Sequence, residues 1–151
     1  MSDLFPTFDV PANIENESGT DTADFNPSID FDFDAGDFTR TSGQFKEADG
    51  FDAWVQWCVK VVKTTRYDCL AYSDQLGVEI PDGFDSMEHS DAETLISDTI
   101  TDALMADPAG RTHSVDEFSF TWGEDNVIMT CTVTAADEAT ATVSATYKRG
   151  R

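Results

Sequence analysis

Three consecutive runs of alternating apolar and polar residues occupy the last third of the chain. Their apolar positions are Phe118, Phe120 and Trp122, then Val127, Met129, Cys131 and Val133, then Ala141, Val143, Ala145 and Tyr147. Residues 123–126 and 135–138, which separate the runs, are typical of turns. Because successive side chains of a strand point to opposite faces of a sheet, the pattern predicts an antiparallel three-strand meander with one buried face.

Two segments ahead of the meander have the period of an amphipathic helix. In the first, Asp49 is the predicted N-cap with Asp52 three residues later, and the apolar stripe comprises Phe51, Trp54, Val55, Cys58, Val61 and Val62. In the second, Ser90 and Glu93 are predicted to form a capping box, and the stripe comprises Ile96, Ile100, Ala103 and Leu104. Asp107 and Pro108 should end this helix, because proline disfavours helical backbone in the residue before it.

Residues 29–34, with the sequence IDFDFD, alternate strictly between apolar and acidic side chains. The alternation predicts a half-buried strand, followed by a turn at 35–37, a returning strand at 38–40 and a second turn at 41–43. The order of these segments is typical of an α+β fold, in which two main helices pack on an antiparallel sheet made of the N-terminal hairpin and the C-terminal meander. We expect residues 1–27 to form an extended acidic arm and residues 28–151 to form a single domain.

The charge of the chain restricts its partners. Nine Lys and Arg residues stand against thirty Asp and Glu residues, which gives a net charge of −21. Such a chain repels phosphate backbones and anionic lipid, so we expect neither a nucleic acid nor a membrane as a partner. The N-terminus lacks the basic region and apolar stretch of a secretory signal, and the three scattered cysteines are typical of reduced thiols. We therefore expect a product made in the cytoplasm and not exported by a signal peptide.

The acidic arm contains large apolar side chains, among them Phe5 and Phe8. A disordered acidic tail is one interpretation of this composition. The other is an arm whose aromatic side chains bind the surface of a partner, since aromatic residues are depleted in disordered segments.

No motif predicts catalysis, a cofactor or a metal ion. Asp30, Asp32 and Asp34 share the first spacings of a calcium-binding loop, but Ala35 and Thr41 stand where that loop needs glycine and glutamate. The His and Cys residues lack the spacing of metal ligands, and the sequence contains no nucleophile elbow, phosphate-binding loop or dinucleotide fingerprint. We expect a protein that is not an enzyme and has no catalytic, cofactor-binding or metal-binding residues.

Two features are candidates for binding another protein. Trp57 lies on the flank of the first helical stripe, where it either buries against the hairpin or anchors an interface. The last strand is rich in Thr and Ala and packs too thinly for a central strand, so we predict an edge at which Ala141, Val143 and Tyr147 pair with a neighbouring chain. A frayed edge followed by a basic tail is the alternative.

Four segments resemble the baseplate wedge proteins of contractile phage tails and phage-tail-like particles, also called sheath initiators. They are IDFDFDAGDF at 29–38, EADGFDAWVQWCVK at 47–60, TTRYDCLAYSDQLGVEI at 64–80 and ALMADPAGRTHSVDEFSFTW at 103–122. The resemblance implies a structural protein with a lysozyme-like fold, located in the baseplate of a virion or tail-like particle. It implies wedge, hub and tail sheath proteins as partners in a sixfold-symmetric assembly, in which the protein templates the first ring of sheath.

The resemblance also implies roles for particular residues. The family has an acidic residue, Pro and Arg in a row after the second helix, and this motif helps to dock the protein to its neighbours. Asp107 and Pro108 match it, while two residues intervene before Arg111. Arg66, followed by Gly77, resembles the family's Arg-loop-Gly stretch, in which the arginine holds the loop or contacts a partner.

Two other functions compete with this interpretation. The net charge of −21 is compatible with an acidic protein that mimics DNA and inhibits a DNA-binding partner, although the basic C-terminus and the apolar arm residues argue against it. A cell-wall hydrolase follows only from the name of the fold, and a fold does not carry a function.

Overall fold

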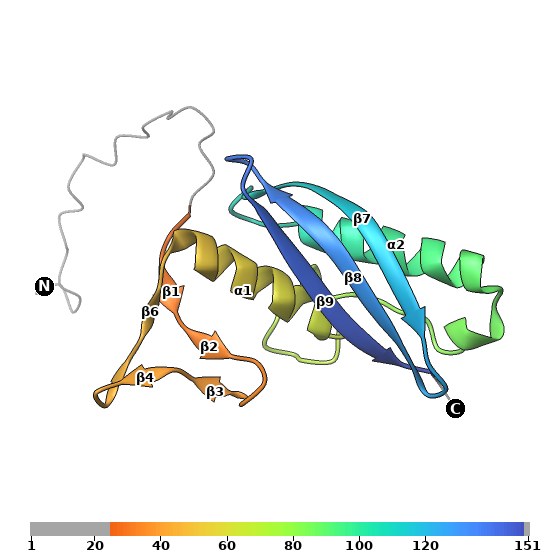
Figure 1. The fold of residues 1–151 in the computed structure, drawn as a ribbon, viewed down its shortest axis with the longest axis horizontal. Coiled ribbons are helices and arrows are strands. Elements are labelled where there is room, and N and C mark those ends of the chain that lie inside the picture. The colour runs from red at the N-terminus through yellow and green to blue at the C-terminus, as the bar shows by residue number, and fades with distance from the viewer. Residues whose placement is uncertain (1–24, 150–151) are drawn as a thin grey trace, which may run out of the picture.

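The computed structural model describes residues 25–149 (Figure 1). Most of the expected arm, with Phe5 and Phe8, lies outside the described residues. The two main helices are α1 (Gly50–Lys63) and α2 (His89–Met105), and a short 3-10 helix, η1 (Phe84–Ser86), precedes α2. The long strands are β7 (Thr112–Trp122), β8 (Asn126–Ala135) and β9 (Thr140–Lys148).

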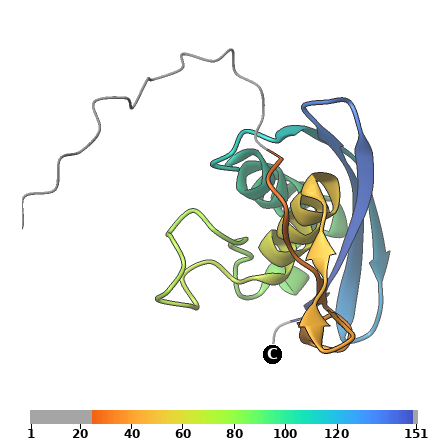
Figure 2. The ribbon, with the colours of Figure 1, turned by 90° about the vertical axis from the view of Figure 1, so that its left-hand side faces the viewer.

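The three long strands form the predicted antiparallel meander, in the order β7-β8-β9. Both helices lie on the same face of this sheet, with α1 against β9 and α2 against β7 (Figure 2). The core fills the space between the sheet and the helices. Its largest fully buried side chains are Trp54, Ile96, Ile100, Leu104, Met129, Val61, Val62, Val127, Val133 and Val143. The α+β class and the helical stripes are therefore confirmed.

The N-terminus of α1 agrees with the cap predicted from the sequence, whereas the N-terminus of α2 does not. At α1, the carboxylate of the N-cap Asp49 accepts a hydrogen bond from the Asp52 N–H at 2.9 Å, as predicted. At α2, the capping box is wrong: the N-cap is Glu88, which makes no side-chain capping bond, and Ser90 lies inside the helix. Glu93 is engaged elsewhere, because its carboxylate accepts a hydrogen bond from the indole N–H of Trp122 at 2.8 Å.

The N-terminal hairpin is made of short, separate ladders and does not join the meander. The pairs are β1 (Ser28–Ile29) with β6 (Glu47–Ala48), β2 (Phe31–Asp32) with β3 (Asp37–Phe38), and β4 (Arg40–Thr41) with β5 (Gln44–Phe45). The strand expected at 29–34 is too long. It ends at Asp32, because the Asp32 carboxylate accepts the backbone N–H groups of Asp34 and Ala35 at 2.9 and 3.0 Å, which starts a turn.

Gln56 fixes the hairpin to α1. Its side-chain oxygen accepts the backbone N–H of Phe31 at 3.0 Å, and its amide donates to the carboxylate of Asp30 at 3.3 Å. The rings of Phe31, Phe38 and Phe45 then follow one another edge-to-face along the hairpin. The hairpin is thus held to the helix by polar contacts and keeps an aromatic row of its own.

Candidate protein-interaction site

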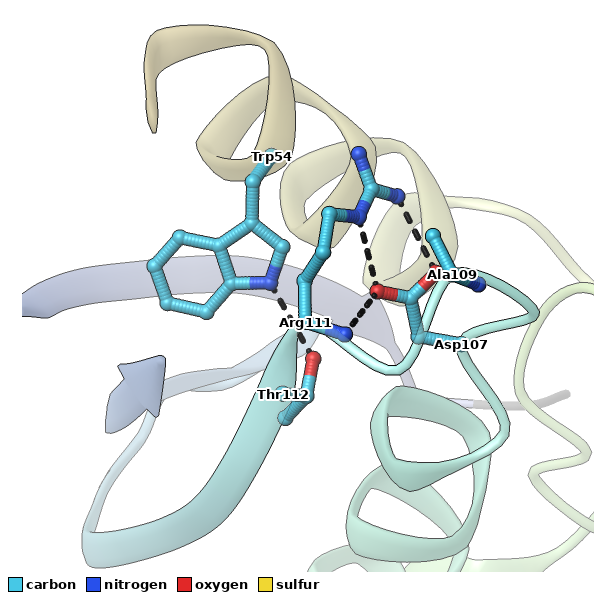
Figure 3. Close-up of polar contacts among 5 residues, drawn as sticks. All are labelled: Trp54, Asp107, Ala109, Arg111 and Thr112. Carbon is cyan, nitrogen blue, oxygen red and sulfur yellow. Dashed lines mark hydrogen bonds and ion pairs between the residues drawn. The ribbon is translucent and has the colours of Figure 1, made fainter. Parts of the chain in front are cut away.

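A tight corner between α2 and β7 holds the segment that resembles the family's docking motif (Figure 3). The carboxylate of Asp107 accepts hydrogen bonds from Nε and Nη2 of Arg111, at 2.8 and 3.0 Å. It also accepts the backbone N–H groups of Ala109 and Arg111, at 3.2 and 3.0 Å. The two residues that separate Pro108 from Arg111 therefore complete a turn, which returns the guanidinium to the carboxylate.

The corner is almost fully desolvated. The side chain of Asp107 is 1% exposed and that of Arg111 is 12% exposed. The guanidinium of Arg111 also lies 5.5 Å from the centre of the Trp57 ring. Asp107 and Arg111 form an ion pair with each other and are largely buried. Pro108 is the exposed member of the motif. Docking of this corner to a neighbour stays a prediction, and it rests on the outer surface of the turn.

Arg66 closes the long loop that follows α1. Its Nε and Nη2 donate to the carbonyl oxygen of Gly77 at 3.2 and 3.1 Å, and a parallel bridge joins Thr65 to Val78. Gly77 has φ +98, and a Cβ there would lie 2.6 Å from the carbonyl oxygen of Thr64, so only glycine fits. Arg66 holds the ends of the loop together, while the loop projects from the domain (Figure 2).

Trp57 lies between the hairpin and the corner. It is half-buried and lines a cavity of about 450 Å³ together with the hairpin residues Phe31, Phe33 and Phe38. This arrangement favours packing against the hairpin over a freely exposed anchor. A role for Trp57 in an interface stays a prediction.

The strand β9 lies at the edge of the meander, since within residues 25–149 it pairs only with β8. The side chain of Val143 is fully buried and that of Ala141 is half-buried. The hydroxyl of Tyr147 donates to the carbonyl oxygen of Val62 at 2.9 Å, and burial raises its pKa. These three side chains serve the core, so any pairing at this edge must use the backbone.

The backbone of β9 presents its unpaired groups at even-numbered residues. The N–H of Arg149 donates to Asp125 at 2.9 Å, and the carbonyl of Ala139 accepts from Ala135 at 2.7 Å. Hydrogen-bonded and non-hydrogen-bonded pairs alternate along an antiparallel ladder. The backbone N–H and C=O groups of the odd-numbered residues of β9 therefore bond to β8, and those of the even-numbered residues point away from β8. The outward groups are therefore those of Thr140, Thr142, Ser144, Thr146 and Lys148.

A groove of about 820 Å³ runs beside the second half of this edge. It is lined by Val62, Lys63, Thr64, Thr65, Val78, Ile80, Ser144, Ala145, Thr146, Tyr147 and Lys148. The sequence predicts the edge strand but not the groove, because the residues opposite β9 come from the end of α1 and from the closed loop after it. The parallel bridge between Thr65 and Val78 had no signal in the sequence pattern.

The thiols of the two core cysteines, Cys58 and Cys131, are buried and have raised pKa values. Burial raises the pKa of Cys58 to about 12, with the Asp107 carboxylate adding to the effect, and burial raises the pKa of Cys131 to about 11. Cys69 is exposed on the loop after α1. Within the described residues, no group of His, Cys, Asp and Glu side chains is placed to hold a metal ion. No described helix is long and apolar enough to span a bilayer.

We expect native labelling with a maleimide at pH 8 to modify Cys69 and to spare Cys58 and Cys131. The thiolate is the reactive form, and a thiol whose pKa lies above the pH by three or more units reacts roughly a thousandfold or more slowly. Mass spectrometry should find one label per native chain and three per unfolded chain. Two or three labels on the native chain would contradict the buried placement of Cys58 and Cys131.

Comparison with known proteins is consistent with this architecture. Residues 28–138 match the model of the contractile injection system sheath initiator family, which is more than half of the chain's 151 residues. No curated protein matches the chain. The sheath initiator family is structural, it is placed in the baseplate of contractile tails, and its role implies contact with sheath and with other baseplate components. The chain belongs to the contractile injection system sheath initiator family.

Proposed function

We propose that this sheath initiator joins wedge and hub proteins of a sixfold-symmetric baseplate, and that it templates the first sheath ring through the free edge of β9. Tail sheath and neighbouring baseplate chains are the partners, and the acidic arm with Phe5 and Phe8 runs along those neighbours. The protein acts as a scaffold and carries out no reaction.

The observation that carries the proposal is the row of outward backbone groups on β9. An unpaired sheet edge accepts a strand from another chain, because main-chain hydrogen bonds supply the affinity. Here the edge runs beside a groove of about 820 Å³, which leaves room for the incoming chain. At the other edge, β7 contains a register shift between Asp116 and Ser119. A bulge of this kind makes an edge a poorer template.

Thr146→Pro should strongly impair initiation of the sheath while leaving the domain folded. Thr146 lies opposite Ile128 in a pair that makes no ladder hydrogen bonds, so proline removes only an outward N–H. In cells where the variant replaces the natural chain, electron microscopy should count sheathed tails reduced by roughly tenfold or more.

Thr146→Val is the matched control, because valine keeps the backbone donor and the branched shape. Circular dichroism and thermal melting of both variants should confirm that each is folded. If Thr146→Pro assembles sheathed tails as well as Thr146→Val does, the β9 edge is not the template.

A further inference from the structure

Two of the residues that line the groove beside β9 are charged, and both are basic: Lys63 at the end of α1 and Lys148 at the end of β9. Both side chains are exposed. The rest of the lining is apolar or carries hydroxyl groups. On a protein with thirty acidic and nine basic residues, the lining of this groove thus carries positive charge only, while Lys148 also borders a second pocket that contains Asp85, Glu124 and Asp125.

Neither lysine is neutralised within residues 25–149. The ion pairs of the described chain join Lys46 to Asp30 and Arg111 to Asp107. The ammonium of Lys63 instead lies 5.5 Å from the centre of the Phe33 ring, a contact that does not cancel its charge. Both ammonium groups remain available to a carboxylate from outside the chain.

The two sides of an added strand would meet different surroundings. Side chains that point toward the helices would face Val62, Val78 and Ile80. Side chains on the opposite side would lie over the outer face of the sheet, where Thr146 and Lys148 are exposed. A cross-strand pair of opposite charge is favourable on such a face, whereas a like-charged pair is unfavourable.

We propose that the occupant of this groove is an extended acidic strand from a different protein chain, with apolar residues at alternate positions and Asp or Glu between them. The inference rests on the proposed function, since it names the chemistry of the strand that β9 accepts. The reach from Ser144 to Lys148 is about 13 Å at 3.3 Å per residue, so about five residues of the partner fill it. A second copy of this chain is disfavoured as the occupant, because two molecules of charge −21 repel each other.

The test uses the full chain and fluorescein-labelled peptides of seven residues that alternate valine with glutamate, glutamine or lysine. Fluorescence anisotropy at low salt should show the glutamate peptide binding roughly tenfold more tightly than the lysine peptide, with the preference shrinking as salt screens the charges. Lys148→Glu should lower or reverse this preference. Lys46→Glu makes the same charge change away from the groove and should leave the preference unchanged.

The outcomes separate this inference from the proposed function. Equal binding of all three peptides, abolished by Thr146→Pro, would keep the edge as a strand acceptor and overturn the acidic occupant. Equal effects of Lys148→Glu and Lys46→Glu would overturn it as well, since the preference would then follow from net charge. Binding of none of the peptides would overturn both proposals. Tighter binding of a peptide with this chain's own residues 2–12 would assign the groove to the arm of another copy.

Discussion

Asp107→Ala should lower the free energy of unfolding by about 3–5 kcal/mol, because it leaves the charge of Arg111 buried and without its partner. The carboxylate also accepts the backbone N–H groups of Ala109 and Arg111, so the substitution removes all four side-chain hydrogen bonds of the corner and leaves only backbone bonds such as that from Gly110 N–H to the Asp107 carbonyl oxygen. Domains of this size are stable by only about 5–15 kcal/mol, so the loss is a large fraction of the total. Urea unfolding followed by circular dichroism measures it.

Two comparisons define what this result means. A double-mutant cycle with Arg111→Met should show strong coupling, since the two side chains contact each other directly. Pro108→Ala changes the exposed member of the same motif and should leave stability within about 0.5 kcal/mol. A loss below about 1 kcal/mol for Asp107→Ala would show that the ion pair does not hold the corner. An assembly defect in Pro108→Ala, with normal stability, would support docking through this turn.

Trp54→Ala should also cost about 3–5 kcal/mol, through the cavity that it leaves in the core. The Trp54 side chain is fully buried, and its ring contacts those of Phe25 and Phe51. Its indole N–H donates to the hydroxyl of Thr112 at 3.1 Å, which joins α1 to the first residue of β7 (Figure 3). Removing it takes away both the packing and the link between helix and sheet.

Trp54→Phe separates the two contributions, because it keeps most of the apolar volume and deletes the donor. We expect it to cost about 1–3 kcal/mol, as a buried hydroxyl loses its partner and a smaller cavity forms. Thermal unfolding of both variants provides the measurement. If Trp54→Ala costs no more than Trp54→Phe, the space around Trp54 collapses and the core is not packed as described.

The strongly acidic composition of this chain suits a protein that assembles with other chains. A net charge of −21 disfavours self-association and leaves attraction to basic neighbours, which is useful for a protein that must join a heterogeneous assembly in one orientation. The lining of the β9 groove differs from this acidic surface, because its charged residues, Lys63 and Lys148, are both basic.

Sequence periodicity predicted the elements that depend on contacts within one segment. The stripe from Trp54 to Val62 and the alternation from Val127 to Val133 both form buried faces. Each spacing places its apolar side chains on one face only if the backbone is helical in the first case and extended in the second. The N-cap at Asp49 was predictable for the same reason, because its hydrogen bond reaches only three residues along the chain.

Predictions failed where a side chain formed a hydrogen bond that competes with the expected element, in one case with a distant residue and in the other with the next turn of the chain. Glu93 has the spacing of a capping box, but Trp122 of β7 binds its carboxylate. The alternation at 29–34 continues through Phe33, but the Asp32 side chain turns the backbone before it. In each case, a side-chain hydrogen bond that the pattern cannot weigh decided the structure.

The sequence by itself thus determined the α+β class, the two helical faces, the meander and the acidic character of the surface, because each follows from residue type and spacing. The tertiary structure alone decided that Trp122 of β7 binds Glu93 of α2, that Gln56 of α1 holds the hairpin at Phe31, and that two lysines from α1 and β9 line one groove. These arrangements join residues from different elements. Their formation depends on how the packed helices and sheet place those residues in space, and no local pattern encodes that placement.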